Sequence, residues 1–416
     1  MTHQPSVTRS AATKFAKPRR LLVVSHALHY GHAGELFSYG PYVREIDIWA
    51  DLFESVTIAA PFRRGMPEGD CVPFTRPNIS VAPQREVGGD TLKAKVALLA
   101  SVPLLVAGLA RAMLKADAIH VRCPGNLGLL GAAMAPLFSR YLVAKYAGQW
   151  NGYEGESAPT RIQRRLLRSG WWRGPVTVYG RWPDQPVNIV PFFTSMMTAG
   201  QVDHAVEIAA QKRIGAPLRV LFSGTLQTRK RVDALIDAVR MLDRDGIALE
   251  VAIVGDGPER EVLRTRAGDL VSRGVVRFVG ALPYDASLQW FEWAHALVLP
   301  SRHSEGWPKV IAEGMCYGLV CVGVAHGQVP EMLSGRGILL DTGSPEEIAG
   351  ALRGIVAAPE RYEPMMRAAS GWARQFSLDG LRDAIAELLA ARWKLPERAA
   401  PAVEPPAWRV TGEETR

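Results

Sequence analysis

Short apolar runs separated by polar turns alternate along the chain with longer stretches of helical periodicity. Continuous apolar runs of this length are typical of parallel strands that are buried on both faces. The alternation of strands and helices therefore predicts an α/β fold with parallel sheets. Strands are predicted at Arg20–Ser25, Val56–Ala59, Ala118–Arg122, Leu218–Phe222, Glu250–Val254, Ala296–Pro300 and Val320–Val324, and helices at Pro41–Phe53, Val232–Leu242, Glu346–Ile355 and Leu378–Trp393.

Two segments of the first half stand out from this pattern. The longest uncharged apolar stretch, Val96–Ala110, is too short to span a membrane and contains Pro103, so we interpret it as a buried core helix. A loop over residues 26–41 with Gly31, Gly34 and Gly40 follows the first strand and suits a Rossmann-like half. It lacks the G-x-G-x-x-G motif, so a nicotinamide cofactor is not predicted.

Length and charge limit the number of domains and the class of partner. A chain of 416 residues is long enough for two domains, and its net charge of +8 favours anionic partners. The positive charge is dispersed and no nucleic-acid-binding module is recognisable, so nucleic acid is not a predicted partner. The four cysteines (Cys71, Cys123, Cys316 and Cys321) contain no C-x-x-C pair, which indicates reduced thiols in a cytoplasmic protein.

The stretch from Ser301 to Gly318 holds two glutamates, Glu305 and Glu313. A polar loop follows a buried strand there, Pro308 is expected in the first turn of a helix, and Gly318 is expected to end it. At the rise of an α-helix the two carboxylates would lie roughly 10–12 Å apart, at the carboxyl edge of the sheet where open α/β folds bind ligands. The spacing alone is weak evidence for a site. A solvated glutamate in the loop followed by an unrelated glutamate on the helix face would give the same spacing.

The surrounding residues resemble a known signature. Three overlapping patterns resemble the signature of family 4 retaining nucleotide-sugar glycosyltransferases. They are Ser-x-x-x-Glu-Gly-x-Pro at Ser301–Pro308, Glu–seven residues–Glu, and Glu-x-Met-x-x-Gly at Glu313–Gly318. The likeness is strong over Ser223–Leu340 and weak over Leu21–Phe193. It implies the GT-B architecture, which is two facing Rossmann-like domains with parallel sheets and an interdomain cleft. It also implies retaining, hexosyltransferase-type transfer from a nucleotide diphosphate sugar, UDP favoured, to a glycan or lipid-linked acceptor, without a metal or a cofactor.

The resemblance assigns roles to individual residues. Glu305 would accept hydrogen bonds from donor-sugar hydroxyls, Glu313 from ribose hydroxyls, and Lys230 would neutralise the leaving diphosphate. The Gly-x-Pro-Glu loop that borders the pocket in the family matches Gly327–Glu331. The implied catalytic residues are Glu305 and Lys230; the implied donor-binding residues are Glu313, Gly224, Thr225, Arg229, Gly255, Gly280, Gly306, Trp307, Pro308, Lys309, Val310 and Arg122; and Gly34 and Gly40 would belong to a turn near the phosphates or the acceptor.

One departure from the family pattern affects the phosphate site. Thr225 stands where relatives have an arginine, and losing a charged hydrogen-bond donor costs roughly 1.5–3 kcal/mol. Arg229, Arg231 or Arg122 is a possible replacement, although Arg122 is equally well explained as a partner of an acidic side chain. His120, in the same predicted strand, is expected to be a core side chain.

Other functions remain open at this stage. A nucleotide-sugar epimerase of the same fold would convert donor without an acceptor, and a non-catalytic homologue would bind donor without releasing nucleotide. The Asp-x-Asp pair, Asp243 and Asp245, lies in a predicted helix-ending turn and has no recognisable partner ligands, so no metal site is predicted.

A basic and aromatic segment lies before residue 174. Arginines at three- and four-residue spacing make one helix face basic, and with two tryptophans this resembles an interfacial membrane-binding element. A solvated helix with packed tryptophans is the alternative. Contact with an anionic membrane would place the protein at the inner face of the membrane. The residues are Arg161, Arg164, Arg165, Arg168, Trp171 and Trp172.

The predicted organisation has five parts. A basic arm over 1–18 and a Pro-rich tail over 395–416 are expected to be disordered. An acceptor domain would span 19–198 and a donor domain 199–376. A helix over 377–394 would cross back to the first domain, as the resemblance implies.

Overall fold

The computed structural model describes residues 19–86, 91–152, 156–301 and 306–394. Glu305 and the predicted arm and tail therefore lie outside the described residues. The chain divides into two compact units. The first holds the described residues up to Lys145, with Ser157–Val176 and those from Arg382 onward; the second holds those within Tyr146–Glu156 and Thr177–Leu381. The predicted domain boundaries stay a prediction.

The first unit is built on a mostly parallel sheet. Its central strand β1 pairs in parallel with β4 on one side and β7 on the other. Along the sheet the strands follow the order β8-β7-β1-β4-β2-β3-β5, and β6 also pairs with β4. The strands are β1 (Arg20–Val24), β2 (His29–His32), β3 (Glu35–Tyr39), β4 (Ser55–Arg64), β5 (Cys71–Pro73), β6 (Ile79–Gln84), β7 (Ala118–Cys123) and β8 (Tyr141–Tyr146).

The segment predicted as a loop over residues 26–41 is instead a β-hairpin. Strands β2 and β3 are antiparallel, with His32 paired to Glu35. Ala33 and Gly34 between them both have positive φ, +50° and +84°. A two-residue turn with two positive φ angles matches the twist of a hairpin. The loop prediction was wrong because three glycines obscured the alternation of the flanking residues.

The helices of the first unit are α1 (Gly40–Ala50), α2 (Leu92–Met113), α3 (Asn126–Met134), a 3₁₀ turn (Ala135–Leu137) and α4 (Ala158–Arg168). Helix α1 ends at Ala50, three residues before its predicted end. Helix α2 buries Leu105 and Leu109, but Val96 and Leu99 are 58% and 71% exposed. The prediction of a buried core helix is thus correct for one face of α2 and wrong for the other. No described helix has the length and apolar character needed to cross a membrane.

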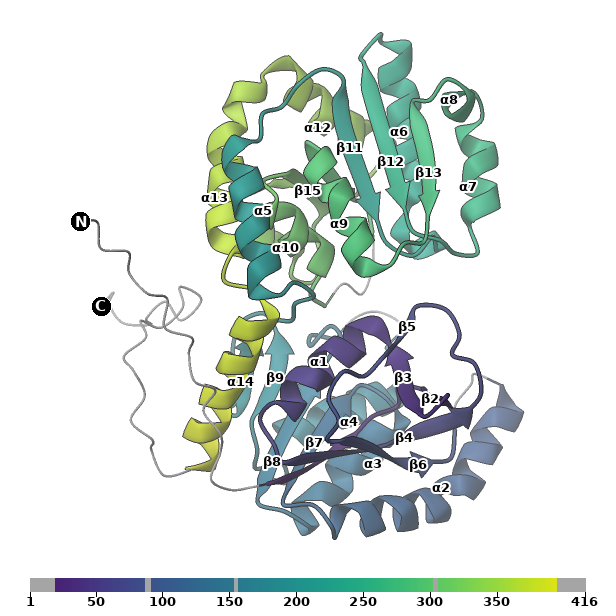
Figure 1. The fold of residues 1–416 in the computed structure, drawn as a ribbon, viewed down its shortest axis with the longest axis vertical. Helices are drawn as coiled ribbons and strands as arrows, with labels where there is room; N and C mark the ends of the chain where they lie inside the picture. The colour runs from purple at the N-terminus through teal and green to yellow at the C-terminus, as the bar shows by residue number, and fades with distance from the viewer. Residues whose placement is uncertain (1–18, 87–90, 153–155, 302–305, 395–416) are drawn as a thin grey trace, which may run out of the picture. The chain divides into compact units, whose positions relative to one another are not determined.

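The second unit contains a six-stranded parallel sheet in the order β13-β12-β11-β14-β15-β16. Figure 1 shows the arrowheads of β11, β12 and β13 pointing the same way. The order runs outward in both directions from β11 and β14, which is the doubly wound Rossmann arrangement. The strands are β11 (Leu218–Ser223), β12 (Leu249–Val254), β13 (Val276–Gly280), β14 (Ala296–Leu299), β15 (Val320–Val324) and β16 (Ile338–Leu340); β9 (Val176–Tyr179) and β10 (Ile189–Phe192) lie where the chain enters this unit.

Alternate residues of these strands pack in two apolar layers, one on each face of the sheet. Val220 and Phe222 of β11 pack in one buried cluster, and Leu221 packs in the other. Helices cover both faces, because a parallel sheet must bury both. They are α5 (Ala199–Gln211), α6 (Val232–Arg244), α7 (Arg260–Ala267), α8 (Asp269–Ser272), α9 (Tyr284–Trp293), α10 (Lys309–Cys316), α11 (Val329–Leu333), α12 (Pro345–Ala357) and α13 (Glu363–Ala373), with 3₁₀ turns at Thr228–Lys230 and Pro359–Arg361. Helix α14 (Leu378–Trp393) follows, and its residues from Arg382 onward belong to the first unit.

Candidate functional site

Three glycines line the carboxyl ends of β11, β12 and β13. The Gly255 N–H donates to the Gly280 carbonyl at 2.8 Å, and the Gly224 N–H donates to the Val254 carbonyl at 3.0 Å. Gly255 has φ of +130°, and a Cβ added to it would lie 2.0 Å from the Gly224 carbonyl oxygen. Only glycine fits there, so the edge presents backbone rather than side chains to a ligand.

The loop after β11 holds the predicted phosphate residues. Thr225 is exposed, and Lys230 is half-buried at the end of the 3₁₀ turn that precedes α6. The Arg229 Nε donates to the Gln227 Oε1 at 3.0 Å. Arg231 has φ of +53° and contacts the Asp233 carboxylate at 3.3 Å. Thr225 and Lys230 therefore share the loop at the carboxyl end of the central strand.

The loop after β14 leads into α10 on the other side of the switch point. Pro308 is the N-cap residue of α10, one position before the predicted first turn, and its ψ of 91° is non-helical. A Cβ added to Gly306 would lie 2.6 Å from the Tyr179 ring, so the loop is packed closely there. Lys309 and Val310 begin the helix, whose first backbone N–H groups have no partner within the helix, as at the N-terminus of any α-helix.

Glu313 is 8% exposed and lies one turn into α10. The Tyr284 hydroxyl, at the start of α9, donates to the Glu313 Oε1 at 3.0 Å. A small pocket is lined by Glu313 and Lys309 together with Thr194, Ser195, Met196, Met197, Ala312, Cys316 and Phe376. A carboxylate fixed in this way can accept a further hydrogen bond from a ligand hydroxyl.

Trp307 lies in an aromatic cluster of the second unit. Its ring centroid is 5.0 Å from that of Phe376 and 6.3 Å from those of Phe193 and Trp372. These contacts anchor the loop that carries Gly306 and Pro308. Of the aromatic residues on α9, Phe291 is buried and Trp290 and Trp293 are partly buried against the core, as packing residues are expected to be.

Arg122 belongs to a buried charge cluster of the first unit. It pairs with Oε1 of Glu45, and the Lys145 Nζ donates to the Glu45 Oε2 at 2.6 Å. Burial by itself would raise the pKa of Glu45, but the charges and hydrogen bonds of Arg122 and Lys145 hold it well below the usual value. The structure therefore shows Arg122 as the partner of an acidic side chain, the second of the two interpretations given for it. His120 is fully buried and stacks on Trp49 at 4.3 Å, which confirms it as a core residue.

The two glycines predicted near the acceptor or phosphates lie at different local structures. Gly34 is the second residue of the β2–β3 turn, and a Cβ added to it would meet no atom within 4 Å. Gly40 is the first residue of α1, and its N–H donates to the Asp70 carbonyl at 3.1 Å.

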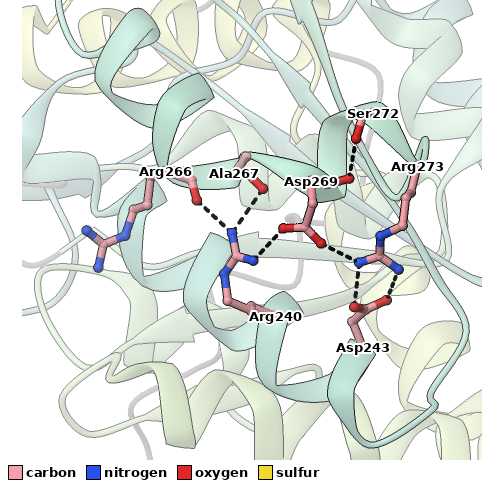
Figure 2. Close-up of polar contacts among 7 residues, drawn as sticks. All are labelled: Arg240, Asp243, Arg266, Ala267, Asp269, Ser272 and Arg273. Carbon is pink, nitrogen blue, oxygen red and sulfur yellow. Dashed lines mark hydrogen bonds and ion pairs between the residues drawn. The ribbon is translucent and has the colours of Figure 1, made fainter.

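The Asp-x-Asp pair is engaged in structural ion pairs. Figure 2 shows the Asp243 carboxylate bound by both terminal nitrogens of Arg273, at 3.0 and 2.6 Å, and Arg273 also reaching Asp269. The hydrogen bonds from Arg273 lower the pKa of Asp243. Asp245 pairs with Arg353. Within residues 19–394 as far as described, no group of three or more His, Cys, Asp and Glu side chains is arranged to hold a metal ion.

The predicted membrane element is partly exposed. Trp171 is 42% exposed, and its Nε1 donates to the Ala133 carbonyl at 3.1 Å. Trp172 is only 2% exposed, so its predicted role in surface contact was wrong: the side chain packs in the first unit. On α4, Arg161, Arg165 and Arg168 are exposed and Arg164 is half-buried.

Residues 206–372, which contain the glycine edge, Lys230 and α10, match the model of the glycosyl transferases group 1. This segment of the chain is therefore similar to the group 1 glycosyl transferases. The chain is 34% identical over 198 residues to the D-inositol 3-phosphate glycosyltransferase of Streptomyces griseus, covering 44% of this chain and 42% of that protein. It is 28% identical over 160 residues to the amylovoran biosynthesis glycosyltransferase AmsK of Erwinia amylovora, covering 37% of this chain and 39% of AmsK. The chain thus spans less than half the length of these two relatives.

The fold of the chain is similar to that of a solved structure. HepE of Anabaena, crystallised with UDP, has a TM-score of 0.63 and 18% identity, covering 90% of this chain and 100% of HepE. At this identity the likeness concerns the fold. The predicted GT-B class, with two α/β units built on parallel strands, is confirmed, and the predicted interdomain cleft stays a prediction.

One cation at the carboxyl edge of the second unit's sheet, Arg260, was not identified from the sequence. The Arg260 Nη1 pairs with the Asp256 Oδ2 at 2.6 Å and lies 3.4 Å from the position of a Cβ on Gly280. The i,i+4 spacing of Asp256 and Arg260 was the available signal.

Proposed function

We propose that the protein is a retaining, metal-independent hexosyltransferase that takes a nucleotide diphosphate sugar as donor. The observation that carries the proposal is the switch point of the second sheet. There the loop with Lys230 follows β11, and the loop and helix with Gly306 and Glu313 follow β14, its neighbour in the sheet. Ligands of doubly wound sheets bind at this point, and the matched family covers both loops.

Each group at the switch point has a task in the proposed transfer. Glu313, buried and oriented by Tyr284, would accept hydrogen bonds from the ribose hydroxyls. Lys230 and the first N–H groups of α10 would stabilise the diphosphate. The bond from the anomeric carbon to the diphosphate breaks, the acceptor oxygen attacks from the same face, and its proton passes to the departing diphosphate oxygen. Glu305 would hold the sugar hydroxyls. No protein nucleophile is required, because stabilisation of the leaving group lowers the barrier.

The donor and acceptor are proposed from the relatives. UDP is favoured as carrier because HepE was crystallised with UDP. The acceptor is proposed to be a glycan or lipid-linked molecule, since AmsK is named for amylovoran biosynthesis. The exposed arginines of α4, with Trp171, support contact with an anionic membrane, and hence a place at its cytoplasmic face.

Metal independence is supported by the engagement of Asp243 with Arg273 and of Asp245 with Arg353, which leaves this pair occupied in the fold. A second candidate function, a non-catalytic nucleotide-sugar-binding protein, is favoured by one observation. Thr225 offers no charge at the arginine position of the family, and Arg122 and Arg231 contact Glu45 and Asp233.

Release of nucleoside diphosphate separates these functions. The protein is incubated with UDP- and GDP-sugars, with and without glycan or lipid-linked acceptors, and with EDTA. We expect acceptor-dependent release that EDTA leaves unchanged. Lys230→Ala and Glu305→Ala should abolish it, whereas Lys115→Ala and Glu261→Ala, exposed control positions, should not. Donor binding without release would favour the non-catalytic protein, and donor conversion without acceptor would favour an epimerase.

A further inference from the structure

Three buried polar atoms in the loops after β14 and β15 have no hydrogen-bond partner among the described residues. They are the Ser301 Oγ, the Trp307 Nε1 and the Gln328 Oε1. Ser301 is 1% exposed and Gln328 is 4% exposed. Leaving a buried polar atom unpaired costs folding free energy, so such atoms are uncommon and call for an explanation.

A direct contact joins these loops. The His326 Nε2 lies 2.6 Å from the Ser301 carbonyl oxygen, which ties the loop after β15 to the loop after β14. The strands themselves are neighbours, with Leu299 paired to Gly323. Ser301 and Gln328 therefore emerge at the same edge of the sheet, the carboxyl edge that also carries the start of α10.

The segment Tyr179–Gly180 connects Gln328 to the loop before α10. A Cβ added to Gly180 would lie 1.8 Å from the Gln328 Nε2, so the amide rests directly on the Gly180 backbone. The Tyr179 ring packs on Gly306, and its centroid is 6.4 Å from that of Trp307. Contacts through Tyr179 and Gly180 thus link Gln328 to the loop that carries Trp307, within the second unit.

The chemistry of the three atoms fits a polyhydroxylated ligand. The amide oxygen of Gln328 accepts, the indole N–H of Trp307 donates, and the Ser301 hydroxyl does both. A sugar ring offers hydroxyls that donate and accept in turn. A site whose buried polar groups need the hydroxyls of a ligand discriminates strongly against a ligand that lacks them.

We propose that Gln328, assisted by Ser301 and Trp307, is a specificity-determining residue that binds hydroxyl groups of the transferred sugar. This inference rests on the proposed function, because it places the sugar of the donor at the carboxyl edge beside α10. The Gln328 Oε1 accepts a hydrogen bond from a sugar hydroxyl, and the other two atoms are satisfied by neighbouring hydroxyls.

The test compares binding of a nucleotide with and without its sugar. Calorimetry measures Kd for UDP and for UDP-glucose, UDP-galactose and UDP-N-acetylglucosamine, with GDP and GDP-mannose as a second pair. Gln328→Met removes the amide at similar size, and Ser301→Ala removes only the hydroxyl. We expect Gln328→Met to weaken the best nucleotide sugar about tenfold, and Ser301→Ala to weaken it several-fold, while Kd for the free nucleotide stays unchanged.

A matched control comes from α13 and its end. The Gln375 Oε1 is also buried without a partner among the described residues, and its Nε2 donates to the Trp372 carbonyl at 2.7 Å. Gln375→Met should leave both Kd values unchanged. An equal loss for nucleotide and nucleotide sugar, or the same loss in Gln375→Met, overturns the inference. If Gln328→Met fails to fold in a thermal melt, Ser301→Ala decides alone.

Failure of the proposed function gives a different result. A protein that releases no nucleoside diphosphate with any acceptor, yet loses affinity for the sugar only in the Gln328 and Ser301 variants, refutes catalysis and supports the sugar site. A protein that transfers sugar at unchanged donor selectivity in both variants supports the proposed function and refutes this inference.

Discussion

Replacing Gly255 by alanine should disrupt the carboxyl edge of the second sheet. The new methyl group would lie 2.0 Å from the Gly224 carbonyl oxygen and 2.9 Å from its carbon. Both of these are backbone atoms, and the Gly224 N–H is fixed to the Val254 carbonyl at 3.0 Å. No side-chain rotation can relieve the overlap, so strands β11 and β12 must separate locally.

The magnitude follows from two contributions. At φ of +130° an alanine is strained, which costs about 1–2 kcal/mol in the left-handed region. Moving the Gly224 oxygen by more than an ångström breaks the hydrogen bonds at Gly224 and Gly255, at about 1 kcal/mol each. The expected loss is therefore about 3–4 kcal/mol, a large share of the roughly 5–15 kcal/mol that stabilises a typical protein.

Substitutions at two other glycines separate the cost of backbone strain from the cost of the steric overlap. Gly246 has φ of +75° with no atom within 4 Å of an added Cβ, so Gly246→Ala should cost only the backbone strain of about 1–2 kcal/mol. Gly350 lies within α12 with open space around it, so Gly350→Ala should stabilise by about 0.5–1 kcal/mol. Hydrogen exchange of peptides from β11 to β13 measures local opening, and urea unfolding measures the total. Equal losses for Gly255→Ala and Gly246→Ala would refute the steric argument.

Three further predictions concern other parts of the molecule. Burial lowers the pKa of His120 well below the usual histidine value of about 6.5. The unfolded chain therefore takes up a proton as pH falls below about 6.5, and His120→Phe should reduce the stability lost between pH 8 and pH 5 by up to about 2 kcal/mol in urea unfolding. Asp243→Asn should leave nucleotide release unchanged and lower stability by less than about 1 kcal/mol, since Arg273 is half exposed; loss of turnover would reopen a metal role. Trp171→Ala with Arg165→Ala should weaken salt-sensitive binding to anionic liposomes, whereas Trp172→Phe should not; an unchanged affinity of the first variant would exclude this face.

The second sheet could be predicted closely because its strands are continuous apolar runs. Glu250–Val254 was predicted and β12 spans Leu249–Val254; Gly318, predicted to end α10, has φ of +68°. The family motifs lie in the loops between these runs, where local sequence decides the structure. The strands and loops of the second sheet could therefore be predicted without knowledge of tertiary contacts.

Other features depend on residues distant in sequence. Glu45 meets Arg122 and Lys145, which are 77 and 100 positions away, and no local pattern marks that pairing. Burial of Gln328 likewise requires Gly180, whose neighbourhood arises only after folding. The exposed face of α2 was missed because apolar side chains on both faces predict burial, although only one face meets the sheet.

The same long-range contacts bear on the missing arginine at Thr225. Arg122 and Arg231 contact Glu45 and Asp233, so moving either to a phosphate would leave a carboxylate without that partner. The proposed diphosphate site then depends on Lys230, the α10 N-terminus and the backbone of Gly224. A cation restored at the exposed Thr225 position should add one charged hydrogen bond.

Thr225→Arg is therefore expected to tighten UDP binding about tenfold, since a hydrogen bond to a charged group contributes about 1.5 kcal/mol. Calorimetry at two salt concentrations should show the gain shrinking as salt rises. Thr225→Met, with a long uncharged side chain, should give no gain, and Thr228→Arg, at an exposed position of the same loop, should give a smaller one. If Thr225→Arg binds UDP no better than the original chain, the diphosphate does not lie beside the loop after β11, and the site must be sought elsewhere on this unit.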